Sequence, residues 1–240
     1  FGIKIKVCDL GNLEIDKTQE VTHKNLTEIV SKILSDGKKA VVLGGGNDIS
    51  YPNGKAMAEV FGARDWLGVN IDSNFGMAIS DKIENSSAFR KILDEKLIRP
   101  DYFYEIAFQT HFVSVVHYRY LQNLNVNLSS LEQIRSRDTA DLELREMMRE
   151  KFISHSESLS TFFNFSFQAI RSADAPGVSN ASPLGLRAGE FIQLVKFAAS
   201  LRNTKLIQFT ELNPEFDENN RTTLLAAIAI HRFCSSQPKT

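Results

Sequence analysis

The segment VNIDSNFGMAIS, residues 69–80, carries a run of apolar residues straight into Asp72. This pattern predicts a buried strand with a carboxylate at its carboxyl end, where open α/β sheets gather their functional groups. The polar positions that follow hold Asn74 and Gly76, although a metal site would need a histidine and a second acid there. The segment is therefore a catalytic loop or what remains of one.

Strand-like and helix-like segments alternate along the rest of the chain. Apolar runs predict strands at residues 3–10, 39–46, 66–72, 102–108, 161–167 and 204–212. Apolar residues at helical spacing predict helices at residues 25–37, 54–62, 87–98, 114–124, 139–153, 188–201 and 220–233. This alternation favours a mainly parallel sheet with helices on both faces. No repeat or linker interrupts it, so we predict that residues 1–240 form a single three-layer α-β-α domain.

The composition is that of an ordinary globular protein. Of the 240 residues, 42% are hydrophobic, and 28 Lys and Arg against 29 Asp and Glu give a net charge of -1. This balance argues against a nucleic-acid-binding surface, and no apolar run has the roughly 20 residues of a membrane span. We therefore expect a soluble, intracellular protein. Because the chain opens with Phe1 rather than Met and leads straight into a predicted strand, we also expect an N-terminal portion to be missing.

The other predicted strand ends also have unusual compositions. GGGNDIS (44–50) lacks the spacing of a dinucleotide fingerprint or a P-loop, so its glycines indicate a tight turn. In TELNPEFDENNRTT (210–223), Glu211 is either a pocket carboxylate or an acceptor for loop amides, and the second role is favoured. His111 follows a predicted strand and could face the same edge, although a surface histidine is the commoner case. By spacing alone, the chain presents no complete catalytic constellation.

Taken together, four stretches resemble the arginase, or ureohydrolase, family, and above all its formimidoylglutamase branch. The family's motifs are Gly-Gly-x-His after a strand, Asp-x-His-x-Asp, Asp-x-Asp ahead of Ala-Pro-Gly, and Glu-x-Asn-Pro-x-x-Asp ahead of a threonine-rich helix start. The corresponding stretches here are VVLGGGND (41–48), IDSNFG (71–76), FSFQ (165–168) with DAPGVS (174–179), and ELNPEFD (211–217). The resemblance extends from Val41 to Phe233. It implies an arginase-like fold and hydrolysis of guanidinium or formimidoyl groups by a two-manganese cluster.

The resemblance also implies which residues would hold the metal ions. The corresponding positions are Asn47, Asp72, Asn74, Gly76, Ser166 and Gln168. Of these, only Asp72 keeps a side chain of the family's ligand type. A manganese pair needs carboxylates and imidazoles to offset its charge and fill its coordination, so the cluster is not expected to form. We therefore predict no metal cofactor and no catalytic residue.

Three functional hypotheses follow from these departures. The leading one is a pseudoenzyme of this fold that serves as a non-catalytic binding, scaffold or regulatory subunit. The alternative is an active hydrolase of linear amidines, of the formimidoylglutamase or arginase type, with an altered metal site built from Asp72, Asp48, Glu211 and His111. The third is a metal-free sensor whose ligand pocket, formed by Asp72, Glu211 and His111, holds a cationic small molecule. Family members are usually oligomers, so a homo-oligomer or a protein partner is expected.

Overall fold

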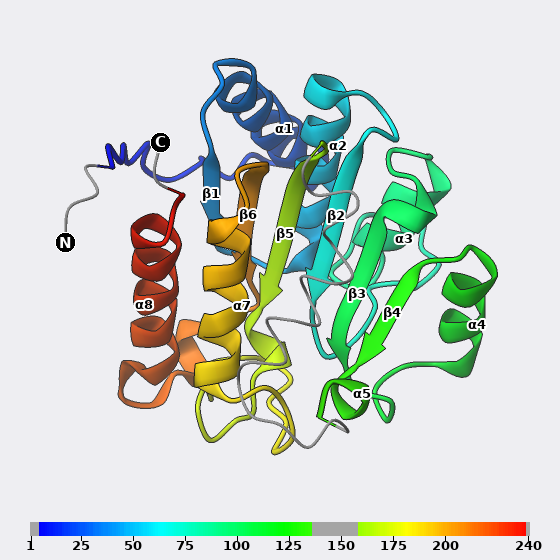
Figure 1. Ribbon diagram of the computed structural model, residues 1–240, viewed down its shortest axis with the longest axis vertical. Coiled ribbons are helices and arrows are strands. Elements are labelled where there is room, and N and C mark those ends of the chain that lie inside the picture. The colour runs from blue at the N-terminus through cyan, green and yellow to red at the C-terminus, as the bar shows by residue number, and fades with distance from the viewer. Residues whose placement is uncertain (1–4, 136–157, 239–240) are drawn as a thin grey trace.

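A computed structural model describes residues 5–135 and 158–238. Within them, six parallel strands form one sheet in the order β1-β6-β5-β2-β3-β4 (Figure 1). The strands are β1 (Ala40–Leu43), β2 (Trp66–Ile71), β3 (Phe103–Phe108), β4 (Asn127–Ser130), β5 (Ser160–Ser166) and β6 (Thr204–Thr210). The four central strands are buried almost throughout, as expected for parallel strands covered on both faces.

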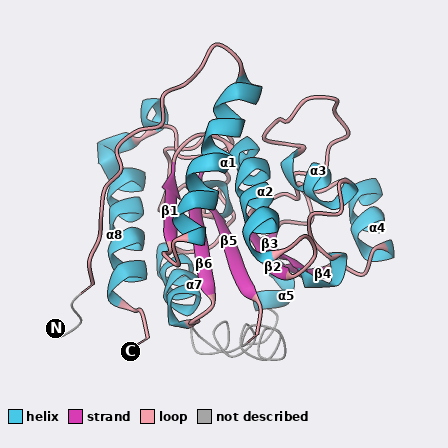
Figure 2. Ribbon diagram, turned by 90° about the horizontal axis from the view of Figure 1, so that it is seen from above, coloured by secondary structure: helices cyan, strands magenta, loops and turns pink. Residues whose placement is uncertain are grey.

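Helices cover both faces of the sheet (Figure 2). One layer contains α1 (Gln19–Ser35), α2 (Ser50–Phe61), α3 (Ala88–Asp94) and α4 (Val115–Asn123), and the other contains α5 (Leu131–Arg135), α7 (Ala188–Ser200) and α8 (Arg221–Ser235). Each layer has its own hydrophobic core, with Met57 and Phe89 in the first and Phe191 and Leu194 in the second. The result is the three-layer α/β fold predicted from the sequence. None of the described helices is long and apolar enough to cross a membrane.

The order of the strands places four separate stretches of sequence next to one another. Because β1, β6, β5 and β2 are neighbours and parallel, their carboxyl ends lie along the same edge of the sheet. The stretches that follow these strands begin at residues 44, 211, 167 and 72 respectively. These stretches contain the residues that correspond to the arginase-family motifs. The order of the strands therefore brings the candidate site together.

Two predictions of secondary structure are wrong. The sequence predicts a strand at residues 3–10, but residues 5–10 are exposed and pair with no strand among the described residues. Their alternating apolar and polar residues suit a strand, but a strand also needs a neighbour to complete its hydrogen bonds. Conversely, β4 and α5 were not predicted, because the sequence NLSS of β4 lacks an apolar run at the sheet edge. The helix predicted at residues 139–153 lies outside the described residues.

The remaining elements occur where they are predicted, with shifted ends. Helix α1 begins at Gln19 because the side chain of Thr18 caps it, accepting a hydrogen bond from the backbone N–H of Val21 at 3.4 Å. Helix α2 begins at Ser50, four residues before the predicted start, and accommodates Pro52 because that residue falls within the first turn. The sequence patterns located the apolar middles of these helices but not their polar first turns.

Candidate functional site

Five buried polar side chains meet at the carboxyl ends of four neighbouring strands. We call them the amide–carboxylate cluster, and its members are Asn47, Asp72, Ser166, Gln168 and Glu211. Asn47 follows the glycine turn after β1, Asp72 follows β2, Ser166 ends β5 and Glu211 follows β6. No member exposes more than 7% of its surface. Side chains from widely separated parts of the sequence therefore share one site, as the strand ends suggested.

The carboxylate of Asp72 is held by neutral donors. Its Oδ2 accepts a hydrogen bond from Asn47 Nδ2, and its Oδ1 accepts one from the backbone N–H of Ser73 at 2.6 Å. The Ser166 side chain is also hydrogen-bonded to this carboxylate. Burial raises the pKa of Asp72 to about 6, against the opposing effect of these hydrogen bonds.

Glu211 is held in a similar way. Its Oε1 accepts a hydrogen bond from the backbone N–H of Asn47, and its Oε2 accepts one from Gln168 Nε2, both at 2.6 Å. The interpretation of Glu211 as an acceptor for loop amides is thus confirmed. Burial raises the pKa of Glu211 to about 7. Both carboxylates of the cluster therefore face amide groups rather than cationic side chains.

Behind the cluster, polar side chains on four strands form a buried ladder across the sheet. Asn164 lies in register with Asn70 and Gln208, and Asn70 lies in register with Glu105. Hydrogen bonds run along the ladder: Glu105 Oε2 accepts from Asn70 Nδ2 at 2.8 Å, and Asn70 Oδ1 accepts from Asn164 Nδ2 at 2.7 Å. Asn164 Oδ1 then accepts from Gln208 Nε2 at 2.8 Å. The sequence analysis missed this ladder, although each of its residues lies between apolar neighbours in its strand, which a sequence pattern can reveal.

The loop after β2 turns sharply at Gly76. The backbone N–H of Gly76 donates to Asn74 Oδ1 at 3.1 Å, and its φ of 59° lies in the left-handed region that favours glycine. A Cβ atom at this position would lie 3.2 Å from Phe89 Cδ2. An aspartate would therefore be strained at Gly76, where the resemblance calls for one.

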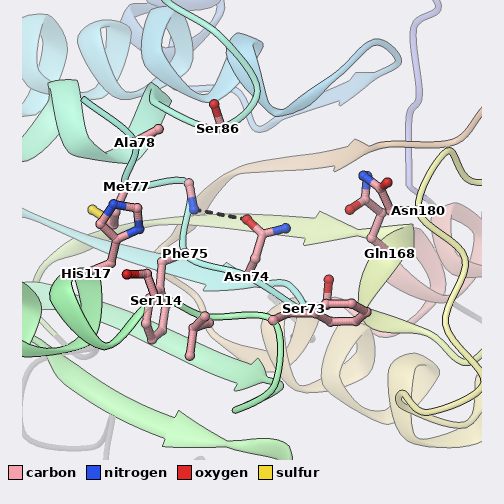
Figure 3. A pocket seen from close by; sticks show the side chains of 13 residues that line it. Ser73, Asn74, Phe75, Met77, Ala78, Ser86, Ser114, His117, Gln168 and Asn180 are labelled. Carbon is pink, nitrogen blue, oxygen red and sulfur yellow. Dashed lines mark hydrogen bonds between the residues drawn. The ribbon is translucent and has the colours of Figure 1, made fainter. Parts of the chain in front are cut away.

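A pocket of about 340 Å³ opens beside the cluster (Figure 3). Its walls are residues 73–78, Ser86, residues 112–114, His117, Gln168 and Asn180. No Asp, Glu, Lys or Arg stands among the described residues that line it. Asp72 and Glu211 were predicted to line a ligand pocket, but both are buried in the cluster and neither forms part of these walls.

Two further candidates are not members of the cluster. His111 is exposed in the turn after β3, with its ring centroid 4.4 Å from that of Phe112, and it lines neither the pocket nor the cluster. Asp48 follows Asn47 in sequence, but its Oδ2 lies 2.8 Å from His23 Nε2 and accepts a hydrogen bond from Gln19 Nε2. His111 therefore points away from the site, and the side chain of Asp48 is bonded to residues of α1.

In the described part of the chain, no group of three or more His, Cys, Asp and Glu side chains is arranged to hold a metal ion. Asp72 and Glu211 are near enough for each to raise the energy of the other's charged form. The amide donors of Asn47 and Gln168 supply the compensating hydrogen bonds. As built, the cluster stabilises two buried carboxyl groups with neutral partners.

Comparisons with known proteins agree on one family. A model of the arginase family matches residues 2–235. The formimidoylglutamase of Staphylococcus haemolyticus is 28% identical over 228 residues, which are 95% of this chain and 71% of that protein. The crystal structure of Trypanosoma cruzi formiminoglutamase with Mn2+2 matches with a TM-score of 0.85 and 28% identity, over 93% of this chain and 74% of that one. Bacillus subtilis formimidoylglutamase shares the fold, with a TM-score of 0.87 at 24% identity, over 96% of this chain and 73% of that one.

These matches span nearly the whole chain and confirm both the resemblance and the arginase-like fold expected from the four strand ends. Formimidoylglutamases match the chain in sequence and in structure alike. The chain belongs to the arginase family and is related to its formimidoylglutamases.

Proposed function

We propose that this protein has lost the dimanganese site of its family and acts as a non-catalytic binding, scaffold or regulatory subunit. One observation carries the proposal: the amides of Asn47 and Gln168 donate hydrogen bonds to the carboxylates of Asp72 and Glu211. These bonds occupy carboxylate oxygens that a metal ion would need. The cluster is complete without a cation.

The side chains at the family's ligand positions do not fit a manganese pair. The nitrogen atoms of Asn47 and Gln168 face the carboxylates, and an amide NH₂ group has no lone pair to offer a cation. Gly76 has no side chain and a backbone that disfavours one. Two divalent cations would also bring more positive charge than Asp72 and Glu211 neutralise.

Without a metal ion, the cluster contains no activated nucleophile. A metal-bound water is the nucleophile that such a centre supplies when its ions are bound. The hydroxyl of Ser166 accepts a hydrogen bond from the backbone N–H of Gln168 at 3.3 Å and is hydrogen-bonded to the carboxylate of Asp72. No histidine stands among the five cluster residues to remove the serine proton and return it to a leaving group, and a serine without such a base is a weak nucleophile.

Elemental analysis of the purified protein tests the proposal. The protein is incubated with Mn²⁺, desalted and analysed, with T. cruzi formiminoglutamase, whose crystal structure contains Mn²⁺, treated identically as a positive control. We expect no stoichiometric manganese in this protein and no hydrolysis of N-formimidoyl-L-glutamate. About two manganese ions per chain together with turnover would contradict the proposal, since that is the dinuclear content of an active centre.

That result would instead establish the alternative, an active hydrolase of linear amidines with an altered metal site. Such a site would draw on Asp48 and His111 beside Asp72 and Glu211. It would require Asp48 to leave His23, which lies 2.8 Å away, and the exposed His111 to turn inward. The non-catalytic proposal requires neither of these movements.

As a subunit, the protein is proposed to form a homo-oligomer or to bind a protein partner. Exposed apolar side chains beside the pocket support this proposal: Ile79, Val115 and Val116 expose 84%, 64% and 72% of their surfaces and adjoin residues that line it. Exposed apolar side chains around a pocket would suit an interaction site. Light scattering on the purified protein would report a mass above 27.0 kDa for a homo-oligomer. Val116→Glu is expected to lower that mass.

A further inference from the structure

The pocket beside the cluster is polar but uncharged. Its polar groups include Ser73, Asn74, Gln168 and Asn180, and its apolar groups include Met77 and Phe112. Figure 3 shows Gln168 and Asn180 toward one end of this pocket and His117 toward the other, with Asn74 between them. A ligand entering here meets the amides of Gln168 and Asn180 at one end, and Met77, Ser114 and His117 toward the other.

The hydrogen bonds of Asn74 and Gln168 fix which atom each presents to the pocket. The oxygen of Asn74 accepts from the backbone N–H of Gly76, which leaves the Asn74 NH₂ group to donate. The nitrogen of Gln168 donates to Glu211 Oε2 at 2.6 Å, which leaves the Gln168 carbonyl oxygen to accept. Neither remaining group has a hydrogen-bond partner among the described residues. The pocket thus offers one donor and one acceptor of known polarity.

Among the described residues that line this pocket, a cationic ligand would find no carboxylate as a counter-charge. The nearby carboxylates of Asp72 and Glu211 are buried and already accept hydrogen bonds from amides. Burial and the charge of Arg90 lower the pKa of His117, so its ring is neutral above its ordinary pKa. Moving a cation from water into such surroundings carries a desolvation penalty that no ion pair offsets.

We propose that this pocket binds an uncharged amide or urea group rather than a cationic amidine or guanidinium group. The ligand's carbonyl oxygen accepts from Asn74 Nδ2, one of its N–H groups donates to Gln168 Oε1, and its apolar part contacts Met77 and Phe112. This inference rests on the proposed function, because metal ions in the cluster would compete for Gln168 and Asn74. Urea and guanidinium groups are both planar and of similar size, so charge is what separates them.

A matched pair of ligands tests the proposal on the full chain. We would titrate n-butylurea and n-butylguanidinium into protein treated with EDTA, at pH 8, where the Glu211 carboxylate is ionised. Binding is measured by chemical-shift changes in two-dimensional amide NMR spectra. We expect n-butylurea to bind at least about tenfold more tightly, a ratio that corresponds to 1.4 kcal/mol. Equal or tighter binding of n-butylguanidinium, or no saturable binding of either compound, would overturn the proposal.

An isosteric variant tests the role of Asn74 directly. Asn74→Asp keeps the acceptor for the Gly76 N–H and replaces the pocket-facing NH₂ group by a carboxylate oxygen. We expect the preference to reverse toward n-butylguanidinium, because the variant supplies the missing counter-charge. The control is Gln122→Glu, which makes the same change at an exposed position of α4 and should leave the preference unaltered. An unchanged preference in Asn74→Asp would overturn the proposal.

The failure of this inference can be told apart from that of the proposed function. Manganese is measured in the same protein before the EDTA treatment. Stoichiometric manganese would contradict the proposed function, whichever ligand then bound. Metal-free protein that prefers n-butylguanidinium would contradict the pocket chemistry alone and leave the non-catalytic proposal standing.

Discussion

Asn47 is bonded through its backbone and side chain to four buried groups on three other strands or their ends. Its backbone N–H donates to Glu211, and its side-chain nitrogen donates to Asp72. Its side-chain oxygen accepts from Asn164 Nδ2 at 3.0 Å and from Thr210 Oγ1 at 2.7 Å. The side-chain amide donates one of these hydrogen bonds and accepts two. An ionised carboxylate has no donor, and a neutral imidazole has a single acceptor nitrogen with one lone pair.

Asn47→Ala is expected to lower the free energy of unfolding by about 2–4 kcal/mol, because it leaves buried polar partners unsatisfied. Urea denaturation followed by the fluorescence of Trp66, the one tryptophan of the chain, measures the change. Asn123→Ala, at the exposed end of α4, is the control and should change stability by less than about 0.5 kcal/mol. Similar small effects in both variants would show that the Asn47 bonds do not stabilise the fold.

At the scale of elements, the loop after β5 is joined to the start of α8. The backbone N–H of Gly177 donates to Thr222 Oγ1, and its carbonyl accepts from the N–H of Asn213, both at 2.8 Å. Asp217 accepts hydrogen bonds from the N–H groups of Thr222 and Thr223 at 2.9 Å each. The residues around Gly177 and Asn213 that correspond to the family's motifs therefore join this loop to α8, and this structural role needs no metal.

Asp217→Ala is expected to cost about 1–2 kcal/mol of stability, since it removes the side chain that satisfies the first N–H groups of α8. The midpoint of thermal unfolding measures this loss. Glu218→Ala is the control, because Glu218 makes only an exposed ion pair with Arg221, and such pairs contribute less than about 1 kcal/mol. A larger effect at Glu218 than at Asp217 would contradict the capping role.

Gly177→Ala and Gly189→Ala should have opposite effects. At Gly177, a Cβ atom would lie 2.7 Å from Asp217 Cβ and 2.9 Å from Thr222 Oγ1, so we expect a loss of about 2 kcal/mol or more. At Gly189 in α7 nothing lies within 4 Å of such an atom, and alanine should stabilise the helix by about 0.5–1 kcal/mol. Calorimetric unfolding of the two variants distinguishes close packing from helix propensity.

At the scale of the whole molecule, the buried ladder links β3, β2, β5 and β6 through the centre of the sheet. Its members, Glu105, Asn70, Asn164 and Gln208, expose 1% of their surfaces or less. Beyond Gln208 the ladder reaches α2, where Asn53 Nδ2 donates to Gln208 Oε1 at 2.6 Å. A shift of any strand by one residue would move its polar side chain to the opposite face and break the ladder. The ladder therefore specifies the register of the central strands.

Three buried carboxyl groups should make the protein less stable as the pH rises. Burial raises the pKa of Asp72 to about 6, that of Glu211 to about 7, and that of Glu105 well above its ordinary value of 4.5. The folded state then keeps protons that the unfolded chain releases, so stability is lost as the pH rises from the ordinary to the raised pKa values. At about 1.4 kcal/mol per unit of pKa shift, Asp72 and Glu211 together should lower the stability by about 4 kcal/mol from pH 5 to pH 8, and Glu105 should add to this fall.

Glu105→Gln should reduce this dependence on pH, because it removes one titrating group while keeping an oxygen for Asn70 to donate to. Urea denaturation at intervals between pH 5 and pH 8 gives the slope for each protein. Glu28→Gln, the same change at an exposed position of α1, should leave the slope as it is in the unaltered chain. A slope unaffected by Glu105→Gln would mean that this carboxyl does not titrate in the range.

The sequence by itself determined the α/β class, the central strands and the stretches that meet at their carboxyl ends. Apolar runs such as WLGVNI and helical spacing report local burial, and local burial is what periodicity can reveal. The role of Glu211 was also predictable, because a carboxylate at a strand end commonly accepts hydrogen bonds from the N–H groups of a neighbouring loop. The resemblance to the arginase family rested on residues at these same strand ends and was confirmed.

Only the tertiary structure decided which groups at those ends are partners. Asn47 and Asp72 are 25 residues apart, and Asn47 and Asn164 are 117 apart, so no local pattern could pair them. Nor could a local pattern show that the turn after β3 leaves His111 exposed, or that residues 5–10 pair with no strand in the described part of the chain. Hydrogen-bond partners are set by strand order and register, and these arise from the packing of the whole sheet rather than from any one segment.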